Sequence, residues 1–269
     1  MNNFLVIETS KNMRSLGRMA MDTQRNTAML AVLIYGVAAM LPSAIISIMF
    51  HGTLGEQMSI LYTLLISGPF AYGLAFIFLG IFRRQQTEVQ QIFLGFEKFA
   101  KTLGLFLYIL LFIILWTMVF IIPGIIASFR YSQAYYIMID HPEYTIRRCV
   151  DESKFRMKGN KEKYFLLSLS FIGWSLLCGI PSIIVGAMAS SIQSFAVFQM
   201  LYIAAMIPYV WLVPYMNLTF VAFYEILVGN LRPEPADAQL FAPEPIDSEP
   251  IVESVVEPVV EPVDTQLPL

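Results

Sequence analysis

Four long stretches without a charged residue restrict the folds that this sequence can adopt. They are Thr27–Phe50, Met58–Phe82, Thr102–Phe129 and Tyr164–Tyr224, with 24, 25, 28 and 61 residues. About 20 consecutive apolar residues are enough for an α-helix to cross the hydrocarbon core of a bilayer. Charged residues make up only 14% of the chain, against about 25% in soluble domains. The sequence therefore predicts an all-α, polytopic membrane protein.

Lysine and arginine residues indicate which helix ends face the cytoplasm. The seventeen basic residues occur before Thr27, within Arg83–Lys101, within Arg130–Lys163 and at Arg232. The short segments His51–Gln57 and Ala189–Gln193 contain none. Because short cytoplasmic loops are enriched in Lys and Arg, we expect the N-terminus, residues 83–101, residues 140–163 and the tail to be cytoplasmic. This arrangement requires about six transmembrane helices, with both termini inside.

The segment Thr102–Asp140 then has to cross the membrane twice. Its 39 residues suffice for two helices that each just span a core of about 30 Å, at about 1.5 Å per residue. Pro123 and Gly124 lie near the midpoint, and these residue types interrupt helices and accept turn geometry. We therefore expect an outward-facing helix turn at this pair. A re-entrant loop there, or residues 125–139 lying flat on the membrane surface, are the alternatives.

Prolines predict irregular helices in the second half of the chain. The last apolar segment, Phe195–Val228, has 34 residues, about 51 Å if straight, and we expect Pro208 and Pro214 to bend or break it. Pro181 and the Gly68-Pro69 pair predict similar kinks in two earlier helices. Such kinks usually reflect packing, but they also occur in the broken helices of transporters.

Two polar segments predict short amphipathic helices on the cytoplasmic side. Glu88–Lys101 has apolar residues at helical spacing, which predicts a helix lying in the inner membrane interface. Thr145–Lys158 is a basic helix that Thr145 can cap at its N-terminus. Its basic residues favour contact with anionic lipid, or they simply set the orientation of the chain.

The chain divides into three regions on composition. Residues 1–26 form a cytoplasmic N-terminal segment, and residues 27–228 form the six-helix transmembrane domain. Residues 229–269 hold nine of the twenty acidic residues and eight of the fifteen prolines. Such a composition cannot bury a core, so we expect a disordered Pro/Glu-rich cytoplasmic tail.

Few polar side chains fall inside the predicted spans. The main ones are Arg130, Asn217 and Glu225, and Tyr131 and Tyr215 add hydroxyl groups nearby. At about 1.5 Å per residue, Arg130 and Asn217 lie at similar depth, about 15 Å from the inner boundary. We expect these five residues to form an intramembrane polar cluster. Arg130 is then either a strut that joins helices or a site for a polar or anionic substrate, unless it lies closer to an interface.

Motifs of enzyme chemistry are missing from the sequence. It contains no HExxH, GxSxG, P-loop or Gly-rich dinucleotide motif, and no nucleophile and base can be paired within the spans. The two cysteines, Cys149 and Cys178, and the two histidines match no zinc site or disulfide framework. We therefore predict a non-enzymatic protein with no cofactor, no metal and no nucleic-acid partner.

Several short motifs, taken in order, resemble a family of bacterial integral membrane proteins that is described only as a domain of unknown function. They are Gly68-Pro69 with Gly73, Gly95-Phe96, Ile122–Ile125, Tyr131-Ser132, Ser153 with Met157–Gly159, Leu169–Trp174, Pro214-Tyr215 and Phe223–Glu225. The resemblance covers roughly residues 15–228. It implies a multi-helix protein of the bacterial plasma membrane, and it supplies no activity, substrate or catalytic residue.

These observations favour an accessory or scaffold protein that acts through a partner. The partners expected are the lipid bilayer, anionic lipid at the cytoplasmic face, and another membrane protein. The alternative is a small transporter or permease-like protein that uses Arg130 and the broken helices as a polar site.

Overall fold

Helices form all the regular structure that the computed structural model describes, which comprises residues 5–50, 52–188, 191 and 194–231. No strand occurs in these residues, so the predicted all-α class is confirmed there. The acidic tail beyond Leu231 lies outside the described residues, and its predicted disorder stays a prediction.

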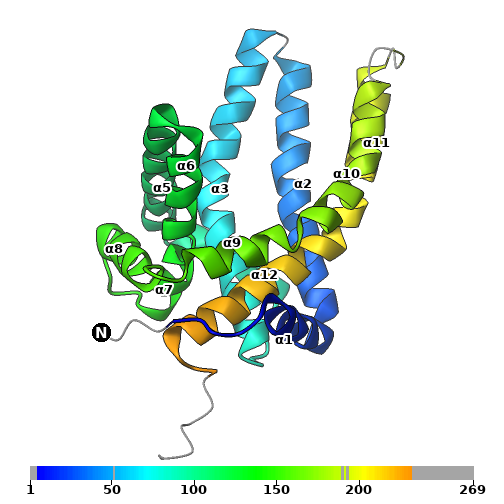
Figure 1. Cartoon of the computed structure of the whole chain (residues 1–269). Coiled ribbons are helices and arrows are strands. Elements are labelled where there is room, and N and C mark those ends of the chain that lie inside the picture. The colour runs from blue at the N-terminus through cyan, green and yellow to red at the C-terminus, as the bar shows by residue number, and fades with distance from the viewer. Residues whose placement is uncertain (1–4, 51, 189–190, 192–193, 232–269) are drawn as a thin grey trace, which may run out of the picture. The chain divides into compact units, whose positions relative to one another are not determined.

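The helices are numbered along the chain in Figure 1. They are α1 (Ser10–Thr23), α2 (Arg25–Met49), α3 (Thr53–Phe82), the 3-10 helix η1 (Val89–Phe93), α4 (Leu94–Glu97), α5 (Phe99–Val119), α6 (Ile121–Tyr131), α7 (Ala134–Asp140), α8 (Ile146–Arg156), α9 (Lys161–Leu169), α10 (Ile172–Ala187), α11 (Phe195–Ala205) and α12 (Ile207–Val228). Three pairs, α2–α3, α5–α6 and α10–α11, project from a base that contains α1, α7, α8 and α12 (Figure 1). We call these pairs the three arms.

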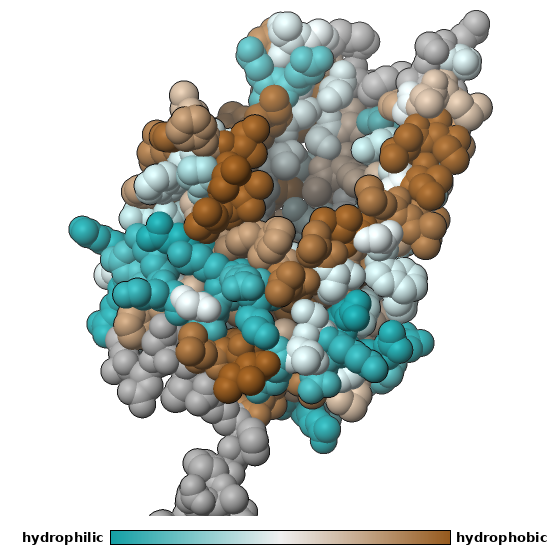
Figure 2. Space-filling model, viewed as in Figure 1, coloured by the Kyte–Doolittle hydropathy of each residue, from teal (hydrophilic) through white to brown (hydrophobic). Residues whose placement is uncertain are grey.

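Hydrophobic residues cover much of the α5–α6 and α10–α11 arms, whereas hydrophilic residues gather mainly on the base and at the tip of the α2–α3 arm (Figure 2). On α5, for example, Leu111, Ile114 and Leu115 are each about half exposed. Exposed apolar side chains along a whole helix are typical of contact with lipid chains rather than with water. The arms are therefore the parts of the fold that are suited to a membrane.

The core lies where the arms join the base. The C-terminal halves of α3 and α12 meet there, and Phe78, Ile81, Leu218 and Phe223 are all fully buried. Almost every residue of α12 from Leu212 to Leu227 packs against another helix. A helix that is apolar all round is stable only when it is enclosed in this way, so α12 forms the centre of the described fold.

Four helical segments are long and apolar enough to span a membrane, and a bent pair raises the number to five. The four are Arg25–Ser47, Thr53–Phe82, Phe99–Val119 and Val197–Val228, and the bent pair is Lys161–Leu169 with Ile172–Ala187. The predicted number of six is therefore not reached among the described residues. The difference arises at the predicted fourth crossing, where α6 and α7 are separate helices of 11 and 7 residues.

The turn between α5 and α6 is present but lies earlier than predicted. The chain reverses at Phe120, whose backbone is extended, and Pro123 and Gly124 belong to the first turn of α6. Proline is tolerated in a first turn because the backbone N–H groups there have no helical partner. Gly124 allows α6 to pack closely on α5, since a Cβ atom on Gly124 would lie 2.1 Å from Thr117 Oγ1.

Two further breaks define the C-terminal part. The predicted break near Pro208 is confirmed, because α11 and α12 are separated at Met206 and Pro208 lies in the first turn of α12. The break between α9 and α10, with a bend of 44°, was not predicted and contains no proline. Ser168 and Ser170 each donate a hydrogen bond to a carbonyl one turn back, at Tyr164 and Leu167. Such serine bonds bend helices.

The segment Glu88–Lys101 forms no single interfacial helix, contrary to the prediction. It consists of η1, α4 and the start of α5, and it is packed tightly on α3. A Cβ atom on Gly73 would lie 1.9 Å from the Ile92 carbonyl oxygen, and one on Gly95 would lie 2.0 Å from that of Pro69. These backbone contacts require short, kinked pieces rather than a straight helix.

The helix predicted after residue 144 is confirmed as α8, and its cytoplasmic position stays a prediction. Thr145 caps it by accepting a hydrogen bond from the Arg148 N–H at 3.3 Å. Cys149, Val150 and Met157 are fully buried on one side of the segment. Gly159 follows with φ +88°, a conformation that favours glycine.

Candidate functional site

Arg83 is the centre of the main charged cluster, at the point where α3 ends. Its Nη1 and Nη2 donate to the two carboxylate oxygens of Asp140 at 2.7 and 2.9 Å. Its Nε donates to Glu225 Oε1 at 2.8 Å. Tyr224 donates to Asp140 at 2.7 Å, and Asn230 donates to Glu225 at 2.6 Å. We call these five residues the Arg83 cluster.

The Arg83 cluster connects the end of α3 to α7 and to α12. The side chains of Glu225, Asp140 and Arg83 are 4%, 18% and 29% exposed. The hydrogen bond with Asp140 is the largest effect that raises the pKa of Arg83 above its ordinary value, and the charge of Glu225 acts in the same direction. The guanidinium group therefore stays charged, and each carboxylate is held by bonds to a fixed partner.

The structure does not bring the predicted polar cluster together. Glu225 belongs to the Arg83 cluster. Arg130 lies in the last turn of α6, where its main-chain carbonyl accepts a hydrogen bond from Ser153 Oγ at 2.8 Å. Asn217 donates to the Val213 carbonyl of its own helix at 2.8 Å. Within the described ranges, no hydrogen bond or ion pair joins Arg130 to Asn217 or Glu225.

The two tyrosines of the predicted cluster are buried in separate places. Tyr131 contacts the ring of Phe112, with 6.4 Å between centroids, and the Lys154 ammonium lies 5.7 Å from the Tyr131 ring. Tyr215 contacts Trp211 at 5.6 Å between centroids, and the Arg18 guanidinium lies 5.7 Å from its ring. The functional roles predicted for these residues stay predictions.

Arg83 contributes to the predicted topology but was not among the predicted site residues. A signal for its structural role was nevertheless present. It is the first charged residue after the uncharged block Met58–Phe82, and the predicted inner boundary lies at Asp140 and close to Glu225. Opposite charges at one depth on separate helices are candidates for an ion pair.

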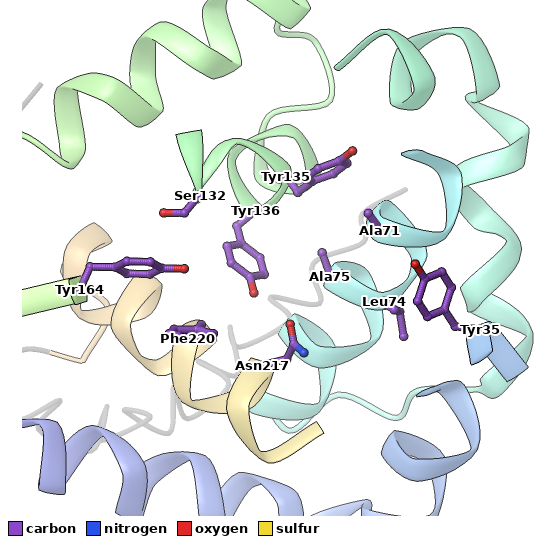
Figure 3. A pocket seen from close by; sticks show the side chains of 10 residues that line it. All are labelled: Tyr35, Ala71, Leu74, Ala75, Ser132, Tyr135, Tyr136, Tyr164, Asn217 and Phe220. Carbon is purple, nitrogen blue, oxygen red and sulfur yellow. The ribbon is translucent and has the colours of Figure 1, made fainter. Parts of the chain in front are cut away.

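A cavity of about 270 Å³ lies where α2, α3, α7, α9 and α12 meet (Figure 3). Its lining consists of Tyr35, Ala71, Leu74, Ala75, Ser132, Tyr135, Tyr136, Tyr164, Asn217 and Phe220. Tyr136, Tyr164 and Asn217 project toward its centre from three different helices (Figure 3). We call it the tyrosine cavity, because four of its ten lining residues are tyrosines.

Polar atoms without partners occur beside the tyrosine cavity. The hydroxyl of Tyr135 and the Oε1 atom of Gln133 are buried and have no hydrogen-bond partner among the described residues. Gln133 lies in the break between α6 and α7, next to the lining residue Ser132. A buried polar atom without a partner costs free energy, about 1–3 kcal/mol. Of these two residues only Tyr135 lines the cavity, so a molecule that binds there with a hydrogen-bonding group beside the Tyr135 hydroxyl would recover the cost of that atom.

The chemistry of the tyrosine cavity is that of an uncharged, hydrogen-bonding site. Its lining contains hydroxyl groups, one amide and apolar carbon, and it contains no carboxylate, imidazole or basic side chain. In the part of the chain that the structure describes, no group of three or more His, Cys, Asp or Glu residues is arranged to hold a metal ion. The cavity also touches the Arg83 cluster, because Tyr136 packs on Tyr224 with 5.1 Å between ring centroids.

Residues 118–230 match the model of a family that is described as "Protein of unknown function (DUF975)". The resemblance to a family of unknown function, inferred from the sequence, is thereby confirmed over this range. The range extends from the end of α5 to the end of α12 and includes Asp140 and Glu225, but it does not include Arg83. No curated protein and no solved structure matches the chain.

Proposed function

We propose that this chain is a non-enzymatic, multi-pass protein of the bacterial plasma membrane that binds a lipid-like molecule in the tyrosine cavity. Its role is that of an accessory protein, which acts through this lipid and through a membrane-protein partner. Both termini face the cytoplasm. The base of the described fold is therefore the cytoplasmic side, and the arms extend into the bilayer.

Charge distribution supports this orientation. The N-terminal segment and α8 contain eight of the seventeen basic residues, whereas the ends of the α2–α3 and α10–α11 arms contain none. Basic residues remain preferentially on the cytoplasmic side of bacterial membrane proteins. The orientation follows from this asymmetry together with the apolar surfaces of the arms.

The tyrosine cavity is the observation that carries the proposed ligand. It lies between apolar arms and has an uncharged lining with hydroxyl groups, including the unpartnered hydroxyl of Tyr135. Its volume of about 270 Å³ lies just below the range of about 300–1,000 Å³ that is usual for ligand pockets. The cavity therefore accommodates the polar end of a ligand, whose apolar tail extends between the arms. An uncharged lipid with a hydroxyl or carbonyl head fits this description.

A variant that fills the cavity tests the proposal. Ala71→Phe places a ring in the lining, and Ala187→Phe makes the same change on the exposed end of α10. The proteins are purified in mild detergent, and the uncharged lipids bound to each are extracted and quantified by mass spectrometry. We expect an uncharged lipid to co-purify with the unmodified protein and with Ala187→Phe, and to be lost from Ala71→Phe. Equal lipid content in both variants, or none in the unmodified protein, would contradict the proposal.

A second variant keeps the test valid if Ala71→Phe does not fold. Tyr135→Phe removes only the unpartnered hydroxyl, so it should leave stability unchanged or slightly higher. Lipid binding should weaken by about fivefold to tenfold, the value of one lost hydrogen bond. Tyr202→Phe, on the exposed side of α11, serves as its control. A variant that binds lipid as well as the control does would argue against the site.

Transport is the second candidate, and the break between α6 and α7 favours it. In many transporters, discontinuous helices line the substrate site, and here Ser132 of this break lines the tyrosine cavity. Arg130 is not among the lining residues, so this form of the alternative uses the cavity rather than Arg130. Movement of a co-purified lipid from the inner to the outer leaflet of vesicles, when the protein is present, would support transport over simple binding.

A further inference from the structure

We propose that a second site, formed by one side of α1 and two tryptophans, binds the head group of an anionic phospholipid. This site is separate from the tyrosine cavity, and it binds an anionic ligand, whereas the cavity binds an uncharged one. It rests on the membrane insertion that is proposed above but not on the uncharged lipid of the cavity.

The site is a groove of about 450 Å³ along α1. Its lining consists of Lys11, Arg14, Ser15, Arg18 and Met19 from α1, Trp174 from α10, and Trp211 and Tyr215 from α12. We call it the α1 groove. One of its walls is basic and belongs to α1, and the other wall is aromatic.

The basic wall contains three cations, and none of them has a carboxylate partner among the described residues. Lys11, Arg14 and Arg18 lie within an arc of about 60° at 100° per residue, so their charged ends are directed to the same side of α1. In the described ranges, no ion pair joins any of the three to an acidic side chain; the nearby pair in sequence is Arg25 with Asp22. Clustered cations repel one another, and a bound anion relieves this repulsion.

The position of α1 is set by the side of the helix that is buried. Met13, Gly17 and Met21 are buried against the fold, and Gly17 lies so close to α12 that a Cβ atom on it would be 2.4 Å from Thr219 Oγ1. The basic wall is therefore held beside the fold rather than free to move in solvent. This preorganisation lowers the entropy cost of binding.

The aromatic wall indicates that the anion belongs to a lipid. Trp174 and Trp211 are 49% and 40% exposed, with 6.5 Å between their ring centroids. Tryptophan is enriched at the level of lipid head groups, where its ring contacts acyl chains and its N–H contacts water. Leu177 and Ile180, which are also exposed, continue the apolar surface along α10. A phospholipid can place its phosphate on the basic wall and its acyl chains along this apolar surface.

Quenching of tryptophan fluorescence by brominated lipid measures this binding directly. For this experiment the full-length protein is made with the substitution Trp116→Phe, which leaves Trp174 and Trp211 as its two tryptophans. It is titrated in detergent with phosphatidylglycerol or phosphatidylcholine that carry the same dibrominated acyl chains. We expect half-maximal quenching at a concentration of phosphatidylglycerol about tenfold lower than that of phosphatidylcholine, because several cations attract the anionic head group.

Two matched variants test whether the α1 groove causes this preference. Lys11→Gln, Arg14→Gln and Arg18→Gln together should abolish it. Arg147→Gln, Arg148→Gln and Lys158→Gln remove the same charge from the segment of α8 and should retain it. The cavity-filling variant Ala71→Phe should also retain it, which separates failure of this site from failure of the tyrosine cavity. Equal quenching by both lipids, or a preference that survives the α1 changes, would overturn the proposal.

Two further measurements distinguish other occupants of the α1 groove. Inorganic phosphate, added at constant ionic strength, should not reverse the quenching, because it lacks acyl chains. Reversal would identify a site for free phosphate and overturn the assignment to lipid. A preference that emerges only when residues 232–269 are deleted would identify the acidic tail as the occupant instead, with the same consequence.

Discussion

Arg83 illustrates how one side chain can connect distant parts of a membrane protein. It is the C-cap residue of α3, and its partners Asp140 and Glu225 follow 57 and 142 residues later in the chain. One guanidinium serves two carboxylates of which one, Glu225, is almost fully buried. Loss of the cation would leave two negative charges side by side in a poorly hydrated place, which is far less favourable than loss of an exposed ion pair.

We expect Arg83→Met to lower the free energy of unfolding by about 2–3 kcal/mol. This is below the value of about 3–5 kcal/mol that is typical when a fully buried pair is broken, because the Arg83 side chain keeps 29% exposure. Thermal unfolding in lipid nanodiscs, followed by circular dichroism, measures the change.

Adding Glu225→Gln to Arg83→Met should recover part of the loss, since it removes the buried carboxylate that has lost its cation. Arg84→Met, at the next residue, serves as the control, because the structure shows no ion pair between Arg84 and a carboxylate of the described residues. If Arg83→Met and Arg84→Met had the same effect, Arg83 would not have the stabilising role that we assign to it.

At the scale of the helices, contacts between backbones decide how the elements pack. Gly17 brings α1 onto α12, Gly124 brings α6 onto α5, and Gly73 and Gly95 bring the segment after α3 back onto it. The positions of prolines are a poorer guide to where the helices break. Pro181 and Pro214 lie inside continuous helices, whereas the bend between α9 and α10 lies in a segment with serines and no proline.

We expect Gly17→Leu to displace α1 from α12 and to destabilise the fold by about 1–3 kcal/mol, as overpacking does in other cores. The reason is that even a Cβ atom at this position would lie 2.8 Å from the Thr219 backbone nitrogen. Hydrogen exchange of residues 10–23, measured by mass spectrometry, should become faster in the variant.

Gly36→Leu is a suitable control, because nothing lies within 4 Å of a Cβ atom built at Gly36. It makes the same change in size on a helix of an arm. Unchanged exchange of α1 in the Gly17→Leu protein would mean that α1 is not held by this contact, and the preorganisation that we infer for the α1 groove would be wrong.

For the whole molecule, the proposed orientation of the arms can be tested with cysteine residues placed at exposed positions. Cys149 is a poor reporter, because it is fully buried and burial raises the pKa of its thiol. Resistance of Cys149 to a thiol reagent would therefore report its burial rather than its side of the membrane. Leu54 at the start of α3 is 65% exposed, and the Arg147 side chain on α8 is 85% exposed.

We expect Leu54→Cys to react with a membrane-impermeant maleimide in spheroplasts and Arg147→Cys to react only after permeabilisation. Both are made in a background that carries Cys149→Ala and Cys178→Ala. The expectation follows from the basic residues of the base, which should remain in the cytoplasm. Ready labelling of Arg147→Cys from outside would reverse the orientation that we propose.

Local sequence was sufficient for the class of the protein and for several of its elements. The uncharged blocks predicted apolar helices, since lipid contact requires apolar residues along the whole length of a span. Thr145 predicted the start of α8, because helix caps depend on residues within one turn. The break near Pro208 was also predictable from the chemistry of proline, and the reversal between Thr102 and Asp140 from the basic residues on both sides of that segment.

Only the tertiary structure decided which polar groups meet. Depth along the helices predicts a group of Arg130, Asn217 and Glu225, but depth does not specify the direction in which a side chain points. The structure instead joins Arg83 to Asp140 and Glu225, assembles the tyrosine cavity from five helices, and places α1 beside two tryptophans. These sites depend on helix rotation and close backbone approach between distant segments, which the order of residues along one helix does not contain.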